Sequence, residues 1–221
     1  MTLQEFSSEF DILYNNIMSN SAPGLDEYEK SVLLTQAQEA IVQKIYNGTF
    51  NTDSFENTEE VKSYLECLIR QVTLTETIKE KGISVNSKLY SLPENLWFII
   101  YESANISSED IKCNSGVAEA IVTPITHDSY YKISNNPFRK DSTRRVLRLS
   151  YDNKIELISS YNIDSYLIRY IEKPEPIILV DLDEYDATIN DMSASNECKL
   201  PEVLHRTILI TAVELAKDLW K

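Results

Sequence analysis

The chain has 221 residues, enough for one sizeable domain or two small ones with a buried core. Its 43% hydrophobic and 25% charged residues are ordinary for a globular protein. The net charge of −14 argues against DNA binding across the whole surface, because phosphate contacts supply most of the affinity of such binders. An acidic protein can still line a passage through which DNA slides, since repulsion prevents sticking.

Several common signals are missing from the sequence. The four glycines stand alone, which excludes glycine-rich phosphate loops and dinucleotide fingerprints. No apolar run approaches the roughly 18 residues of a membrane span, and the acidic N-terminus has no signal-peptide pattern, so we expect no membrane partner. The three cysteines are far apart and odd in number, which favours free thiols in a reducing compartment.

The first part of the chain, residues 1–80, is predicted to be helical. Thr2 and Glu5 have the spacing of a capping box, and so do Asp26 and Glu29. Apolar residues follow each pair at steps of three and four, which predicts two amphipathic helices.

A third helix is predicted to open at residues 57–60. The second helix should end before it at Asn47-Gly48, because glycine suits the left-handed position after a helix. The apolar face of the third helix is expected to comprise Val61, Tyr64, Leu65, Leu68, Ile69 and Val72.

Residues 81–200 are predicted to hold a mostly antiparallel sheet. Its strands are short β-branched and aromatic runs bounded by proline and polar residues. Asp152-Asn153-Lys154 separates two of these runs and predicts a hairpin. The expected strands are 96–101, 117–123, 146–151, 155–159, 163–171 and 177–180, with one or two helical turns from Thr126.

An amphipathic helix over residues 201–221 is predicted to close the chain. The order of elements is N-terminal helices, a mostly antiparallel sheet and a C-terminal helix, which is typical of the α+β class. We therefore predict a single α+β structural domain over residues 1–221.

The strand predicted at 163–171 is apolar on both faces, so we expect protein to cover both. Leu167 and Ile168 lie on opposite faces, and we predict that both are buried, one of them against helices of the same chain. Arg169 would need a partner in such a strand, because an unpaired buried charge is very costly.

Charge is segregated along the chain. Residues 1–60 carry −9, residues 132–148 carry +5 and residues 172–202 carry −7. Like-charge blocks are usually solvated faces. The alternative is self-complementarity, in which the basic segment of one copy meets an acidic face of another. The candidate interface residues are Arg139, Lys140, Arg144, Arg145, Arg148 and Arg169.

Signals for catalysis are weak. His127 and His205 have no cysteine or carboxylate at metal-ligand spacing beside them, and the cysteines have no nucleophile context. The acidic cluster from Asp181 to Asp186 follows a predicted strand, where carboxylates can bind magnesium for phosphoryl transfer. An acidic solvated loop explains the cluster better. We therefore predict no catalytic, metal or cofactor-binding residues, and keep a metal-dependent phosphoryl-transfer enzyme as a less favoured alternative.

Four segments of the chain resemble structural proteins of crAss-like and related tailed bacteriophages. None is a catalytic signature, so the specificity lies in the set and in its order. The set is similar to head–tail connector, or ring, proteins of these virions. The segments are LDEYEKSVLLTQAQEAIV (25–42), ISNNPFRKDSTRRVLRL (133–149), YLIRYIEKPEPIIL (166–179) and LPEVLHRTILITAVELA (200–216).

The resemblance implies a structural virion protein rather than an enzyme. Such a subunit would form a homo-oligomeric, twelvefold ring below the portal in the neck or tail, next to the portal and other ring proteins. Genomic DNA would pass through the lumen without sequence-specific binding. The protein would be made in the host bacterial cytoplasm and end in the virion. From the residues alone, a non-virion adaptor that binds host or phage proteins stays open.

Overall fold

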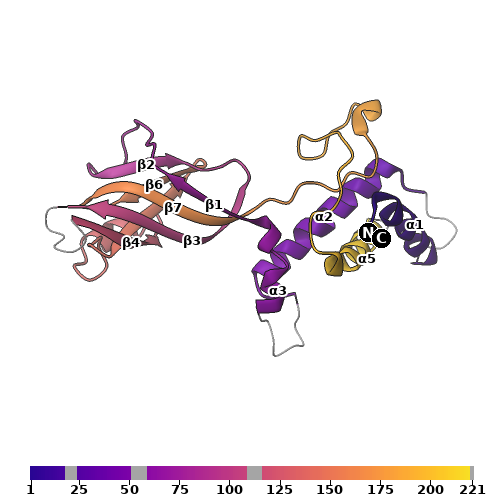
Figure 1. Cartoon of the computed structure of the whole chain (residues 1–221), viewed down its shortest axis with the longest axis horizontal. Helices are drawn as coiled ribbons and strands as arrows, with labels where there is room; N and C mark the ends of the chain where they lie inside the picture. Colours follow the sequence, from indigo (N-terminus) through magenta and orange to yellow (C-terminus); the bar gives the residue numbers. More distant parts are fainter. Residues whose placement is uncertain (18–23, 51–58, 109–115, 220–221) are drawn as a thin grey trace. The chain divides into compact units, whose positions relative to one another are not determined.

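The computed structural model describes residues 1–17, 24–50, 59–108 and 116–219 (Figure 1). The chain divides into two compact units, a helical unit of Met1–Leu68 and Lys173–Lys221 and a sheet unit of Ile69–Glu172. The sheet unit is therefore inserted between two parts of the helical unit. The predicted α+β class is confirmed. That the two units act as one domain stays a prediction.

The helical unit begins with the two predicted capping boxes. The Thr2 N–H donates to Glu5 Oε2 over 2.7 Å, and the Asp26 N–H donates to Glu29 Oε2 over 3.0 Å. The reciprocal bonds to the threonine hydroxyl and the aspartate carboxylate are also present. The helices of this unit are α1 (Leu3–Ile17), α2 (Glu27–Tyr46), α3 (Glu59–Ser63), η1 (Glu66–Leu68), η3 (Leu182–Tyr185) and α5 (Glu202–Asp218).

The core of the helical unit lies where α1, α2 and α5 pack together. Apolar residues at helical spacing supply it, as the sequence pattern predicts. Burial of this stripe stabilises the helices more than intrinsic propensity does. Its fully buried members include Phe6, Phe10, Leu34, Ala37, Val42, Ile208, Leu209 and Ala212.

The third helix is shorter than predicted. α3 ends at Ser63, and the residues from Ile69 form the first strand of the sheet. Val72 therefore lies in a strand and not on a helix face. Residues 69–74 pair with a strand about a hundred residues further along the chain, and this long-range pairing overrides the local helical pattern. The predicted boundaries of the sheet-rich part, residues 81 and 200, are correspondingly wrong, because the sheet runs from Ile69 to Glu172.

The strand predicted at 177–180 is also wrong. This stretch makes only an isolated bridge between Ile178 and Asn196. Pro174 and Pro176, just before it, have no N–H to donate to a ladder. The apolar residues of this stretch are buried as the pattern predicts, since Ile177 and Ile178 are fully buried. Among the described residues, however, no strand forms a ladder with the stretch.

Side chains of α2 bind the backbone of this stretch instead. Ser31, Thr35 and Gln38 lie on one face of α2 at helical spacing. Each hydrogen-bonds a backbone group of the extended segment, so its polar groups are satisfied without a sheet. The bonds are Leu179 N to Ser31 Oγ (3.0 Å), Ile177 N to Thr35 Oγ1 (3.1 Å), Thr35 Oγ1 to Ile177 O (3.3 Å) and Gln38 Nε2 to Glu175 O (2.8 Å).

Seven strands form one curled, mixed sheet in the order β1-β7-β3-β4-β5-β6-β2 (Figure 1). All pairs are antiparallel except β4 and β5. A bridge between Ile78 and Leu89 joins the segment after β1 to β2. The elements are β1 (Ile69–Leu74), β2 (Ser87–Ser91), β3 (Leu96–Ser107), β4 (Val117–Pro124), α4 (Tyr130–Ser134), β5 (Arg145–Tyr151), β6 (Lys154–Ile158) and β7 (Asn162–Glu172).

Two connections matter for function. The predicted hairpin between β5 and β6 is confirmed, with Asp152 and Asn153 at φ of 48° and 53°, as a tight primed turn requires. The parallel pair β4 and β5 needs a long crossover, because parallel neighbours cannot be joined by a hairpin. That crossover, residues 125–144, holds α4 and most of the basic segment.

A bulge in β7 changes which residues face the core. Asn105 pairs with Ser165 and Ile106 with Ile163, so Asp164 is an extra residue. The alternation therefore shifts by one position along the strand. The buried residues of β7 that pack in the sheet core are Ile163, Tyr166, Ile168 and Tyr170.

The prediction for the central residues of β7 is half correct. Ile168 is fully buried, whereas Leu167 is only partly buried. Ile168 also packs in a core built from strand residues of the sheet unit, and not against helices. The sequence shows that a strand needs an apolar cover, but not that other strands of a curled sheet supply it.

Candidate assembly surfaces

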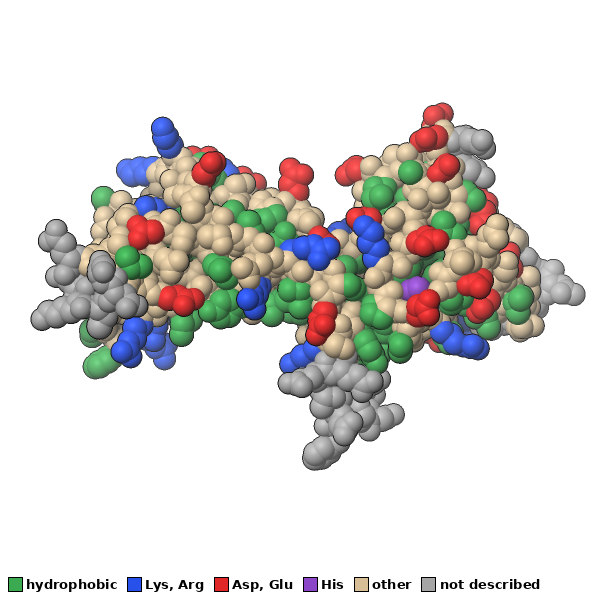
Figure 2. Space-filling view, viewed as in Figure 1, with side chains coloured by type: hydrophobic (Ala, Val, Ile, Leu, Met, Phe, Trp, Pro, Cys, Tyr) green, Lys and Arg blue, Asp and Glu red, His purple; other side chains and the backbone are tan. Residues whose placement is uncertain are grey.

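Net charge distinguishes the two units. The helical unit has 22 acidic and 8 basic residues, whereas the sheet unit has 13 of each. The whole net charge of −14 therefore lies in the helical unit. Figure 2 shows Asp and Glu side chains gathered over this unit on the face in view. Such a surface attracts cationic partners and repels nucleic acid.

The basic loop, residues 135–144 between α4 and β5, is held by hydrogen bonds within the loop and from the first residue of β5. The carbonyl of Asn136 accepts the N–H groups of Arg139 (3.0 Å) and Lys140 (2.9 Å). The Arg145 guanidinium donates to the carbonyl of Phe138 over 3.1 Å. These bonds fix the loop before any partner arrives, which lowers the entropy cost of binding.

The basic loop presents an aromatic ring together with positive charges. Phe138 is 88% exposed, and Tyr131 in the preceding helix is 77% exposed. The side chains of Arg139, Lys140 and Arg144 are exposed as well. Aromatic and arginine side chains are the residues most enriched at the energetic centres of protein interfaces.

The sequence prediction named the charges of this loop and missed its aromatics. The signal that could have found Phe138 is the run NNPFRK, where a large apolar residue stands in a turn next to two bases. A buried role for that phenylalanine was equally compatible with the pattern. Only the structure shows that nothing in the described part of the chain covers the ring.

Arg148 faces inward, unlike the other bases of the segment. Its guanidinium lies 3.3 Å from the carboxylate of Glu102, and both side chains are largely buried. The hydroxyl of Tyr166 donates to the same carboxylate. Burial raises the pKa of Glu102, and the hydrogen bond from Tyr166 and the charge of Arg148 offset this only in part. Arg148 thus has a partner within the sheet core, which narrows the predicted interface set.

Arg169 is also separate from the basic loop. It lies exposed on β7, and its Nε donates to Gln71 Oε1 over 2.7 Å. Gln71 is the register partner of Arg169 on β1. β3 and β4 lie between β7 and β5 in the sheet, so the structure does not bring Arg169 to the loop.

The candidate metal and catalytic residues do not converge. Among the described residues, no group of three or more His, Cys, Asp and Glu side chains could hold a metal ion. The carboxylate of Asp181 accepts the Ser195 N–H over 2.7 Å. His205 is buried and bonded to the carbonyl of Leu200, while His127 lies exposed beside β5. Each group therefore has a local role.

The thiol of Cys198 is poorly suited to nucleophilic chemistry. Burial raises its pKa to about 11, so the thiolate is scarce at neutral pH. In the ranges that the structure describes, no helix is long and apolar enough to cross a membrane.

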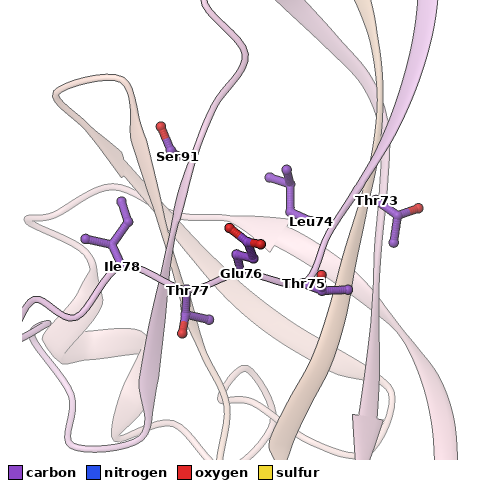
Figure 3. Close-up of a pocket in the computed structure, with 7 residues that line it drawn as sticks. All are labelled: Thr73, Leu74, Thr75, Glu76, Thr77, Ile78 and Ser91. Carbon is purple, nitrogen blue, oxygen red and sulfur yellow. The ribbon is translucent and has the colours of Figure 1, made fainter.

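A recess of about 450 Å³ lies beside the end of β1 (Figure 3). Glu76 is the only ionisable residue in its lining, and the hydroxyls of Thr73, Thr77 and Ser91 point in different directions. Among the described residues, no hydrogen bond joins Glu76 to a hydroxyl of this lining, as the activation of a nucleophile by a base would require. The full lining is Thr73, Leu74, Thr75, Glu76, Thr77, Ile78 and Ser91.

The fold and surfaces describe a structural subunit with two oppositely charged regions. Residues 1–219 match the family described as phage tail ring protein 3/4, and the chain belongs to this family. It is 44% identical over 220 residues to "Ring protein 3" of Bacteroides phage crAss001, covering 98% of this chain and 95% of that protein. It is 39% identical over 236 residues to "Ring protein 4/5" of the same phage, covering 98% and 92%. The predicted resemblance to structural ring proteins of crAss-like phages is confirmed.

Proposed function

We propose that this ring protein assembles into a homo-oligomeric, twelvefold ring in the neck or tail of the virion, below the portal, and that the genome passes through its lumen. One observation carries the ring geometry. A closed ring larger than a dimer needs two different complementary surfaces on every subunit. The acidic helical unit and the basic loop of the neutral sheet unit are two such surfaces.

The contacts are assigned to the basic loop. Arg139, Lys140 and Arg144 are exposed, and we assign them to an acidic neighbour, either the next subunit or an adjacent ring. Arg145 acts by holding the carbonyl of Phe138, so it positions the loop. Arg148 is assigned to the sheet core with Glu102.

The net charge also suits a passage for DNA. Repulsion from a −14 subunit keeps the duplex from sticking as it moves, and no sequence-specific readout is needed. The protein acts in this role without catalysis. It is made in the host cytoplasm and functions in the virion.

Electron cryomicroscopy of purified virions tests the proposal. We expect the chain as a twelvefold ring around the neck or tail passage, next to the portal or another ring protein. A chain that is absent from purified virions, or that binds its partners only as a monomer or dimer, would favour an adaptor outside the virion and overturn the proposal.

Charge reversal tests the assigned contacts. Exposed ion pairs are worth about 0–1 kcal/mol each, so Lys140→Glu with Arg144→Glu should leave the melting temperature nearly unchanged. Virion incorporation should fall, while Lys140→Arg with Arg144→Lys should incorporate normally. Normal incorporation of the reversed variant would contradict the assignment. Salt-sensitive binding of the purified protein to duplex DNA would instead assign these bases to phosphates.

A further inference from the structure

A second recess, of about 340 Å³, lies in the helical unit. The first turns of α1 and α2 form its walls together with the extended segment bound along α2. Leu3, Leu179 and Val180 give it an apolar part, to which the rest of the lining adds polar groups. The full lining is Leu3, Gln4, Ser7, Ser8, Glu27, Leu179 and Val180.

The walls of this recess are fixed by ion pairs around one buried side chain, that of Lys30. Lys30 is 4% exposed and lies 2.9 Å from Glu27 and 2.8 Å from Asp11. Glu27 also accepts a hydrogen bond from the Ser7 hydroxyl over 2.9 Å. Burial lowers the pKa of Lys30, but the bonds to Asp11 and Glu27 outweigh it and leave the pKa raised. Lys30 therefore stays charged, and its bonds to Asp11 and Glu27 hold α1 against α2.

The surroundings of the recess are acidic. Asp26 precedes Glu27 in the chain and Asp181 follows Val180, and both aspartates are exposed. The whole unit adds a net charge of −14. Glu27 lines the recess, and Asp26 and Asp181 are next in the chain to lining residues; we call these three the acidic rim. Apolar lining residues with an acidic rim complement the exposed Phe138 ring and its flanking bases.

We propose that Phe138 of one copy inserts into this recess on the next copy of the ring. The inference rests on the proposed ring function and identifies the two surfaces through which neighbouring copies contact each other. A phenyl ring that is 88% exposed on a fixed loop has the properties of an interface anchor. Arg139, Lys140 and Arg144 then face Asp26 and Asp181 around the rim. The occupant is a second copy, because ring closure requires each subunit to carry both the knob and the hole.

Photo-cross-linking in assembled particles tests this contact. Position 138 is replaced by p-benzoylphenylalanine, in particles assembled from a mixture of isotope-labelled and unlabelled copies. We expect cross-links from position 138 to residues 1–9 or 179–180, in pairs that combine the two isotopes. Cross-links within one isotope alone, or to DNA, to another ring protein or to any other segment, would overturn the proposal.

Two controls keep the result specific. Val85 is a fully exposed apolar residue of the sheet unit, which also contains Phe138. Replacing Val85 by p-benzoylphenylalanine should give no cross-link to the recess. Gln4 is an exposed residue of the recess lining. Gln4→Arg should lower the cross-link yield about tenfold through like-charge repulsion, while Gln4→Glu should keep it. Equal yields for the two variants would contradict the acidic-rim argument.

Failure of this contact can be separated from failure of the ring function. Particle imaging reports the ring independently of cross-linking. Rings that assemble normally while position 138 cross-links elsewhere would overturn the contact and leave the ring proposal standing. A chain that is missing from the particles would overturn the ring proposal itself.

Discussion

The helical unit and the sheet unit satisfy buried polar groups in different ways. In the helical unit, side chains of α2 bind the backbone of an extended segment, and the buried Lys30 pairs with two carboxylates. In the sheet unit, hydrogen bonds between neighbouring strands satisfy most of the strand backbone. The largely buried ion pair of Arg148 and Glu102 lies between strands of this sheet. The helical unit carries all the net charge, whereas the large fully buried side chains of its core are apolar. Apolar packing thus serves folding, which leaves the surface charge available for the assembly proposed above.

The largest expected effect comes from Ile168→Ala in the sheet core. Removing a fully buried isoleucine side chain typically costs about 2–5 kcal/mol. Hydrogen exchange should rise throughout residues 69–172 and much less in the helical unit. Leu167→Ala is the matched control, and its partly buried side chain should cost less. Equal increases of exchange in both units would show that they unfold as one body.

A smaller loss is expected from Thr35→Val in the helical unit. The change is nearly isosteric and removes the hydroxyl that bonds the N–H and the carbonyl of Ile177. Leaving these buried groups unpaired costs about 1–3 kcal/mol. Urea unfolding followed by hydrogen exchange should place the loss in the helical unit. Thr35→Ser retains the hydroxyl and should recover most of the stability.

Two buried tyrosines of the sheet core should respond differently to loss of the hydroxyl group. The Tyr166 hydroxyl donates to Glu102, so Tyr166→Phe should destabilise the fold by about 1–2 kcal/mol. The Tyr90 hydroxyl is buried without a hydrogen-bond partner in the described part of the chain, so Tyr90→Phe should be neutral or stabilising. Denaturant midpoints of the two variants compare them directly. Equal losses would refute the distinction.

The same tyrosines set an alkaline limit to stability. Burial, with a smaller effect of Asp164, raises the pKa of Tyr90 to about 12 from the usual 10.0. Burial, followed by the charge of Glu102, raises the pKa of Tyr166 as well. The unfolded chain then loses these protons first, so stability should fall as the pH rises above 10. Tyr90→Phe should flatten the slope between pH 10 and 12 in thermal scans.

The smallest effect is expected from salt. Added salt screens the self-repulsion of the −14 unit, whereas the sheet unit is neutral. Raising sodium chloride from about 0.05 M to about 0.5 M should stabilise the helical unit by roughly 1 kcal/mol or less. Hydrogen exchange resolved by unit measures it. A larger gain in the sheet unit would contradict the charge assignment.

Local signals predict much of this fold, and long-range pairing accounts for the errors. The capping boxes, the β5–β6 hairpin and the amphipathic C-terminal helix follow from residues close in sequence. Ile69 and Val72 continue a helical pattern and still form a strand, because β7 pairs with them. The partner of Ile177 and Ile178 is a row of hydroxyl and amide groups on α2, which no periodicity shows.

The sequence also predicts only part of the candidate assembly surface, and tertiary structure decides the rest. The excess of positive charge over residues 132–148 is visible in the sequence, and it does fall largely in one crossover. Which bases reach the surface depends on tertiary structure. The strand turns Arg148 inward to Glu102, whereas Arg144 stays exposed just before β5. The exposure of Phe138 depends on the shape of a loop, and composition alone does not give it.

The pairing of Ile69 with Ile171 has a consequence for how the sheet unit is joined to the rest of the chain. The chain leaves the helical unit and returns to it through two residues that are direct partners, about 5 Å apart between their Cα atoms. A short turn could therefore join residues 68 and 173, and a different module could be grafted through the same two junctions. The helical unit is thus built from two chain segments that could be rejoined without the inserted sheet unit.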